Sequence, residues 1–131
     1  MTGFRLTLAS PRAVEHIDAV TSFVGTDASG RFGILPGRAP LITVLTFGLA
    51  RFRTGENGPW RYLALPGGTL HVEGDALRIA CRHFTLGDDA GALQTALADD
   101  ARREDERRAD LRHNLDRFEQ KLMQRLWELE R

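Results

Sequence analysis

The fold is decided by the stretch Arg31-Phe32-Gly33-Ile34-Leu35-Pro36-Gly37-Arg38-Ala39-Pro40-Leu41, in which glycines and prolines fix where the backbone bends. Pro36 has no backbone donor and a fixed φ, while Gly37 tolerates a positive φ. The pair therefore fits the centre of a type II turn. No Lys-Ser/Thr pair and no helix start follow the glycines, so the stretch predicts a structural turn and not a phosphate-binding loop.

Strands are expected on both sides of this turn. Residues 31–35 form a short apolar run that ends in the turn. Pro40 favours an extended conformation at Ala39, and residues 41–45 (Leu-Ile-Thr-Val-Leu) are rich in strand-forming side chains. A second strand is therefore predicted from Leu41 to Leu45.

Length and charge limit the classes of function. A chain of 131 residues is long enough for one modest domain and an appendage. Its 18 basic and 18 acidic residues balance, so nothing in the charge points to nucleic acid or to an anionic membrane as a partner. The N-terminus has no basic region followed by an apolar core, and no apolar run is long enough to span a bilayer. A cytoplasmic protein without direct membrane insertion is expected.

The first two thirds of the chain read as β-structure. From Phe4 to about Phe84 apolar and polar residues mostly alternate, and turn residues separate the runs. Short strands closed by frequent turns predict an antiparallel β-sandwich or barrel, assigned to residues 1–88. The turns are expected at 10–11, 27–30, 36–37, 55–59, 66–68 and 74–75.

The last third reads as helix, which makes the fold class α+β with a helical domain over residues 89–131. No Gly or Pro occurs after Gly91, and Asp88 or Asp89 is suited to cap the helix. A charged block over residues 102–110 separates two apolar stripes. The first stripe contains Leu93, Ala96, Leu97 and Ala101, and the second contains Leu111, Leu115, Phe118, Leu122, Leu126 and Leu129. The block fits either the middle of one long helix or the bend of a helical hairpin, and both remain open.

The stretch at 31–41, the pair Gly67-Gly68 and the charged helical tail resemble the epsilon subunit of F-type ATP synthases over nearly the whole chain. The resemblance implies a non-catalytic subunit of the central stalk that couples ion translocation to ATP synthesis or hydrolysis. Its sandwich would bind the gamma subunit and the c-ring, and its C-terminal helices would reach the alpha/beta catalytic head and inhibit hydrolysis. The subunit would be peripheral, on the cytoplasmic face of the bacterial inner membrane.

The resemblance also indicates which residues meet partners. Arg38 stands where the family usually has His, and His71 stands where it often has Glu, so both are expected at contacts with the rotor. The divergent strand around Thr21–Gly25 suggests an alternative ion-translocating ATPase, either proton- or sodium-coupled. The helical residues expected at the partner surface are Leu111, Leu115, Phe118, Leu122 and Leu126.

Some bacterial epsilon subunits bind ATP through an Asp-x-x-Arg element near the start of the first C-terminal helix. Asp99 and Arg102 have this spacing, which makes ATP a candidate regulatory ligand. A carboxylate and a guanidinium one turn apart also form local ion pairs in ordinary helices, and this interpretation is favoured here.

No catalytic or metal site is expected. The histidines fall in separate elements without ligand spacing, and the serines lack an adjacent base. Cys81 continues the alternation of Leu77 and Ile79 and is expected to be a small buried apolar residue. The sequence therefore predicts no cofactor. A freestanding adaptor that self-associates through a coiled coil over residues 111–129 is the alternative function.

Overall fold

The computed structural model describes residues 3–129, so the outermost residues of both predicted domains lie outside the described range. It has a β-sandwich followed by one long helix, which confirms the α+β class. The order of elements is β1 (Phe4–Ala9), β2 (Val14–Asp27), β3 (Gly30–Ile34), β4 (Leu41–Leu45), β5 (Gly48–Thr54), β6 (Arg61–Leu65), β7 (Gly68–Glu73), β8 (Ala76–Ala80), β9 (Thr85–Gly87) and α1 (Ala90–Leu129).

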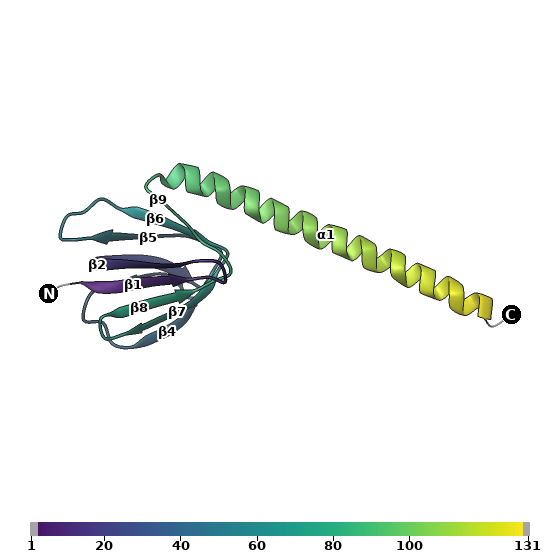
Figure 1. Ribbon diagram of the computed structural model, residues 1–131, viewed down its shortest axis with the longest axis horizontal. Coiled ribbons are helices and arrows are strands. Elements are labelled where there is room, and N and C mark those ends of the chain that lie inside the picture. Colours follow the sequence, from purple (N-terminus) through teal and green to yellow (C-terminus); the bar gives the residue numbers. More distant parts are fainter. Residues whose placement is uncertain (1–2, 130–131) are drawn as a thin grey trace. The chain divides into compact units, whose positions relative to one another are not determined.

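The strands form two layers that share β2 (Figure 1). One layer runs in the order β1, β8, β7, β4, and the other contains β3, β2, β5, β6 and β9. Almost all neighbours are antiparallel, as the alternation predicted. The exception is β1, which runs parallel to β8, so the first strand of the sandwich lies beside one of its last. This pairing closes the sandwich on itself.

The strand β2 bends where it passes from one layer to the other. Its first half pairs with β1, and its second half pairs with β5 and β3. Ala19 lies at the bend with a φ of 59°, and the register of both the β1 and the β5 pairing shifts next to it. Such a β-bulge increases the local twist of a strand. The Ala19 carbonyl accepts a hydrogen bond from the Gly55 amide at 3.1 Å, which ties the bend to the end of β5.

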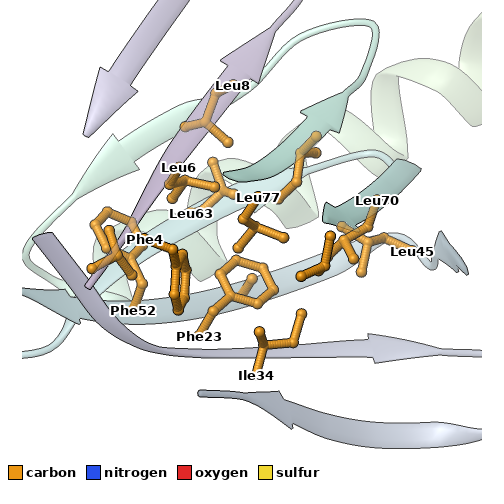
Figure 2. Packing of buried hydrophobic residues seen from close by; sticks show 14 of the residues in the cluster. Phe4, Leu6, Leu8, Phe23, Ile34, Leu45, Phe52, Leu63, Leu70 and Leu77 are labelled. Carbon is orange, nitrogen blue, oxygen red and sulfur yellow. The ribbon is translucent and has the colours of Figure 1, made fainter. Parts of the chain in front are cut away.

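The core lies between the two layers and is built of apolar side chains (Figure 2). Phe23 of β2 and Phe52 of β5 are fully buried among side chains of the opposite layer. The apolar residues that alternate with polar ones along β1, β7 and β8 are all buried: Phe4, Leu6, Leu8, Leu70, Val72, Leu77 and Ile79. Each large apolar side chain buried in this way contributes about 1.5–3 kcal/mol. The alternation therefore identified the interior of the sandwich correctly.

The turn that decides the fold is present. Gly37 has a φ of 83°, as a type II turn requires at its second central position. The strand expected over residues 31–35 runs from Gly30 to Ile34, and β4 covers the predicted residues. In the pair Gly67-Gly68, the second residue must lack a side chain, because a Cβ on Gly68 would overlap the carbonyl oxygen of Ala80.

The helix begins after an Asp cap and is continuous. The Asp89 carboxylate accepts hydrogen bonds from the amides of Gly91 (2.9 Å) and Ala92 (3.4 Å), as expected for an N-cap. A single helix, not a hairpin, follows, so the charged block is helical. Good helix formers and the absence of Gly and Pro account for this.

The described chain divides into two compact units, with the division between Leu97 and Ala98. Leu93 and Leu97 in the first turns of α1 are buried and pack with Ala64 of β6. The first turns of the helix thus belong to the unit that contains the sandwich. The predicted division into domains of residues 1–88 and 89–131 stays a prediction.

Replacing Gly37 by Val should lower the free energy of unfolding by about 1–2 kcal/mol, because a β-branched residue is strained at this φ. Space is not the cause, since a Cβ at Gly37 meets no atom within 4 Å. Gly33→Val is the matched control, because Gly33 lies exposed in β3 without a positive φ, and it should change stability by less than about 0.5 kcal/mol. Chemical denaturation of both variants measures the difference. Equal effects would contradict the assigned turn.

Candidate partner-binding surfaces

The outer face of β4 carries an apolar strip on the sandwich, which we define as Ile42 and Val44. Their side chains are 75% and 64% exposed, whereas Leu45 on the same strand is buried. Leu35 and Phe47, which precede and follow β4 in sequence, are also exposed. Exposed apolar side chains that are gathered on one element often mark an interaction site, whereas scattered ones are normal on protein surfaces.

One edge of β4 is largely unpaired. The strand pairs with β7 along its whole length, but its other edge meets β2 only at Leu45, opposite Asp27. Within residues 3–129, the backbone of β4 from Leu41 to Val44 therefore has no second strand partner. Natural edge strands are usually protected by charged residues or by cover, and β4 has no charged residue. The apolar strip and the open edge together make β4 the best-supported docking element on the sandwich.

Of the two residues that the resemblance assigned to the rotor contact, one lies beside this strip. His71 of β7 pairs directly with Ile42 of β4, and its Nε2 lies 3.5 Å from Glu73 Oε2. Arg38 is exposed in the segment between the Gly37 turn and β4. Their role in binding stays a prediction, although the strand pairing places His71 next to the exposed strip.

The strip itself was missed by the sequence analysis. The sequence predicts a strand from Leu41 to Leu45 but does not by itself indicate that Ile42 and Val44 are exposed. The signal was present, because an alternating strand with apolar residues on both faces must either be covered on both faces or leave one exposed. Which of these occurs depends on neighbouring elements and is not encoded in the five residues.

Asp27 fixes the position of β4 relative to the turn that follows β2. Its carboxylate accepts a hydrogen bond from the Thr43 hydroxyl at 2.7 Å and others from the amide and hydroxyl of Ser29. These bonds hold the pKa of the Asp27 carboxyl below its usual value, with the Ser29 hydroxyl as the largest cause and Thr43 next. Thr43 lies between the two residues of the strip, so this contact anchors the strip directly.

The second compact unit presents the other predicted surface. This surface is the second apolar stripe of the helix, and the side chains that the sequence places at a partner surface are between 50% and 66% exposed. Met123, Trp127 and Leu129 are exposed on the same unit. The helix after Leu97 therefore carries a long apolar stripe with no partner within the described residues. The predicted members of the stripe are Leu111, Leu115, Phe118, Leu122 and Leu126.

Asp99 and Arg102 form the local ion pair that the spacing favoured. The Arg102 guanidinium lies 3.6 Å from Asp99 Oδ1, and both side chains are at least half exposed. The two charges are thus satisfied by each other one turn apart. Binding of ATP at this pair stays a prediction.

Other kinds of site find little support in the part of the chain that the structure describes. That part contains no group of three or more His, Cys, Asp or Glu residues able to hold a metal ion. Cys81 lies half-buried just after β8 and packs against the core, and burial raises the pKa of its thiol. Between residues 3 and 129, no helix is long and apolar enough to cross a membrane.

Comparison with known proteins decides the family. Residues 3–87, which span the whole sandwich, match the family model described as ATP synthase, Delta/Epsilon chain, beta-sandwich domain. The chain belongs to this family. The relatives described next carry the name ATP synthase epsilon chain.

Two bacterial relatives are close in sequence. The chain is 42% identical over 86 residues to the ATP synthase epsilon chain 2 of Cereibacter sphaeroides, which covers 65% of this chain and 58% of the relative. It is 41% identical over 95 residues to the ATP synthase epsilon chain 2 of Paraburkholderia xenovorans, covering 71% and 68%. The match thus spans less than two thirds of the first relative's length.

Solved structures share the fold. A chain in the central stalk and c-ring structure of the Tetrahymena thermophila mitochondrial ATP synthase superposes with a TM-score of 0.53 at 16% identity, covering 63% of this chain and 65% of that one. A chain in the Euglena gracilis mitochondrial ATP synthase gives a TM-score of 0.58 at 20% identity, covering 74% and 62%. At these identities the likeness concerns the fold alone.

Proposed function

We propose that this chain is a central-stalk subunit whose sandwich docks onto the gamma subunit through the apolar strip of β4. The observation that carries the proposal is the exposure of Ile42 and Val44 together on one face of an edge strand. Family membership supports the assignment to the ATP synthase, and the Tetrahymena chain of similar fold belongs to a central stalk and c-ring assembly. In this role the chain transmits rotation and performs no chemistry.

The strip has the physical properties that such a contact needs. Covering an exposed Ile or Val contributes about 1.5–3 kcal/mol, and binding sites commonly depend on a few such anchors. The chain has no net charge, so shape and apolar contact supply most of the binding free energy. His71 beside the strip and Arg38 in the segment before β4 provide polar groups, which set orientation more than affinity.

The remaining partners follow from the same assignment. We propose that the sandwich also contacts the c-ring and that the complex holds the chain at the cytoplasmic face of the bacterial inner membrane. Both bacterial relatives are named epsilon chain 2, which supports an alternative ion-translocating ATPase as the host complex. The coupling ion, proton or sodium, is decided by the c-ring.

Replacing both Ile42 and Val44 by Asp should weaken binding to the gamma subunit encoded with this chain by about 100-fold or more. The double variant loses two apolar contacts and places carboxylates where water is excluded. Val14→Asp is the matched control, because Val14 is 60% exposed at the start of β2, away from β4, and should leave the affinity unchanged. Calorimetric titration measures all three proteins. Equal weakening by the control, or full binding by the double variant, would show that β4 is not the docking element.

We also propose that the helical tail regulates ATP hydrolysis. Its exposed apolar stripe requires a partner. If the stripe can dock in two alternative positions of similar free energy, and one of them blocks hydrolysis, the tail acts as a brake. The alpha/beta catalytic head is the partner that the family assignment suggests. ATP bound near Asp99 and Arg102 would bias this balance as a regulatory ligand.

Deleting residues 109–131 should about double ATP hydrolysis by the assembled complex if the braked and released states are equally populated. Changing Leu115, Phe118 and Leu122 to Ser within the full-length chain should have the same effect, since it removes the stripe and keeps the chain length. Changing Asn114 and Gln120 to Ser on the same helix serves as the control and should leave the rate unaltered. An unchanged rate in all assembled complexes would make the tail a structural element only.

A further inference from the structure

Arginines gather on the outer face of the layer formed by β3, β2, β5 and β6, which does not contain the apolar strip. Arg51 and Arg53 of β5 both stack on the ring of Trp60, with guanidinium carbons 4.4 and 4.6 Å from the ring centre. Two cations on one indole hold each other's side chains in place through the shared ring. Arg51 is therefore pre-positioned, which lowers the entropy that a ligand must overcome to order it.

A cleft of about 200 Å³ lies beside this stack, and all of its lining residues belong to the first compact unit. Arg31 of β3 and Arg51 of β5 both line it. The hydroxyl of Thr26 and the side chains of Tyr62 and Gln94 add hydrogen-bonding groups to its wall.

The floor of the cleft is apolar, because Val24 and Leu49 are part of its lining. An apolar floor with a few convergent polar groups is the usual construction of a small-molecule site. At this volume the cleft is smaller than the roughly 300–1,000 Å³ of drug-sized sites, so a small ligand is required.

The positive charge of the cleft is not neutralised by the protein. The described residues include no ion pair to Arg31, Arg51 or Arg53. Two acidic side chains on neighbouring elements are engaged elsewhere, since Asp88 pairs with Arg61 and Asp27 binds Ser29 and Thr43. Guanidinium forks that face a cleft without a carboxylate fit an oxyanion, which they bind through two parallel hydrogen bonds.

We propose that this cleft binds a small ligand with two oxyanion groups, carried on phosphates or carboxylates, with Arg31 and Arg51 each holding one group. The short connecting part of the ligand lies over Val24 and Leu49. The hydroxyls and the Gln94 amide complete its hydrogen bonds. This site is distinct from the Asp99 and Arg102 pair, and it does not depend on the docking of β4.

The test is a nuclear magnetic resonance titration of the full-length chain with sodium pyrophosphate and, separately, with sodium succinate. Saturable shifts should appear at the Trp60 indole and the Gln94 side-chain amide with at least one of the two probes. A response to pyrophosphate alone identifies a phosphate-bearing ligand, and a response to succinate alone identifies a dicarboxylate. Absence of saturable shifts at these groups with either probe at millimolar concentration overturns the proposal.

Variants separate this site from general attraction of anions. Arg31→Gln combined with Arg51→Gln should weaken binding about tenfold or more, because charged hydrogen bonds are lost at both ends. Arg12→Gln combined with Arg117→Gln changes the net charge equally at exposed positions outside the cleft and should have less than a twofold effect. Arg31→Lys with Arg51→Lys keeps the charge, loses the fork geometry and should fall in between. Equal loss in the Arg12 and Arg117 control overturns the proposal, and the wild-type shifts decide the matter if a variant fails to fold.

Discussion

The bend of β2 at Ala19 is the constraint on which the rest of the structure depends. One strand serves both layers of the sandwich because its backbone turns there, at a left-handed conformation that costs an L-residue about 1–2 kcal/mol. Hydrogen bonds to the end of β5 offset this cost, since the Ala19 carbonyl accepts from the Gly55 amide and the Thr21 hydroxyl donates to the Gly55 carbonyl. Without the bend, the two layers could not enclose the common core around Phe23 and Phe52.

The path of β2 also determines which surfaces remain open. Because its second half is occupied by β5 on one edge and β3 on the other, β2 meets β4 only at the single pair of Asp27 and Leu45. The edge of β4 is left without a strand, and its apolar side chains point outward. On the opposite layer the first turns of α1 cover Ala64 but leave the arginines of β5 beside an open cleft. A partner surface and a ligand cleft thus arise from the same topology on different faces.

Local signals in the sequence predicted most of the sandwich. The Pro36-Gly37 turn, the alternation on β1, β7 and β8, and the Asp cap of the helix each depend on neighbouring residues, and each was confirmed. The first half of β2 was missed because Glu15, His16 and Asp18 are exposed and break the apolar alternation. The three-residue β9 is too short to leave a pattern. The choice between one helix and a hairpin was open because the absence of turn residues in the charged block favoured one helix, whereas the family resemblance favoured two helices.

The functional surfaces were harder to predict than the fold. The family resemblance alone suggested Arg38 and His71, whose role stays a prediction, and no local pattern singled out Ile42 and Val44. Their exposure results from pairings between strands far apart in sequence, which a local pattern does not contain. The same holds for Arg31 of β3 and Arg51 of β5, because β4 lies between these strands in sequence and only their shared pairing with β2 brings them together. The freestanding adaptor has no support from the family match, because an adaptor would have no need for the sandwich of an ATP synthase subunit.

Hydrogen–deuterium exchange of this chain, alone and bound to the gamma subunit encoded with it, tests the central claim most directly. The amides of an edge strand that face away from its one neighbour exchange rapidly until a partner covers them, whereas strands paired on both edges are protected throughout. The amides of residues 41–45 that face the open edge should therefore slow on complex formation, while those of β5 and β6 on the opposite layer should not change. Unaltered exchange in β4, with new protection confined to β5 and β6, would contradict the account.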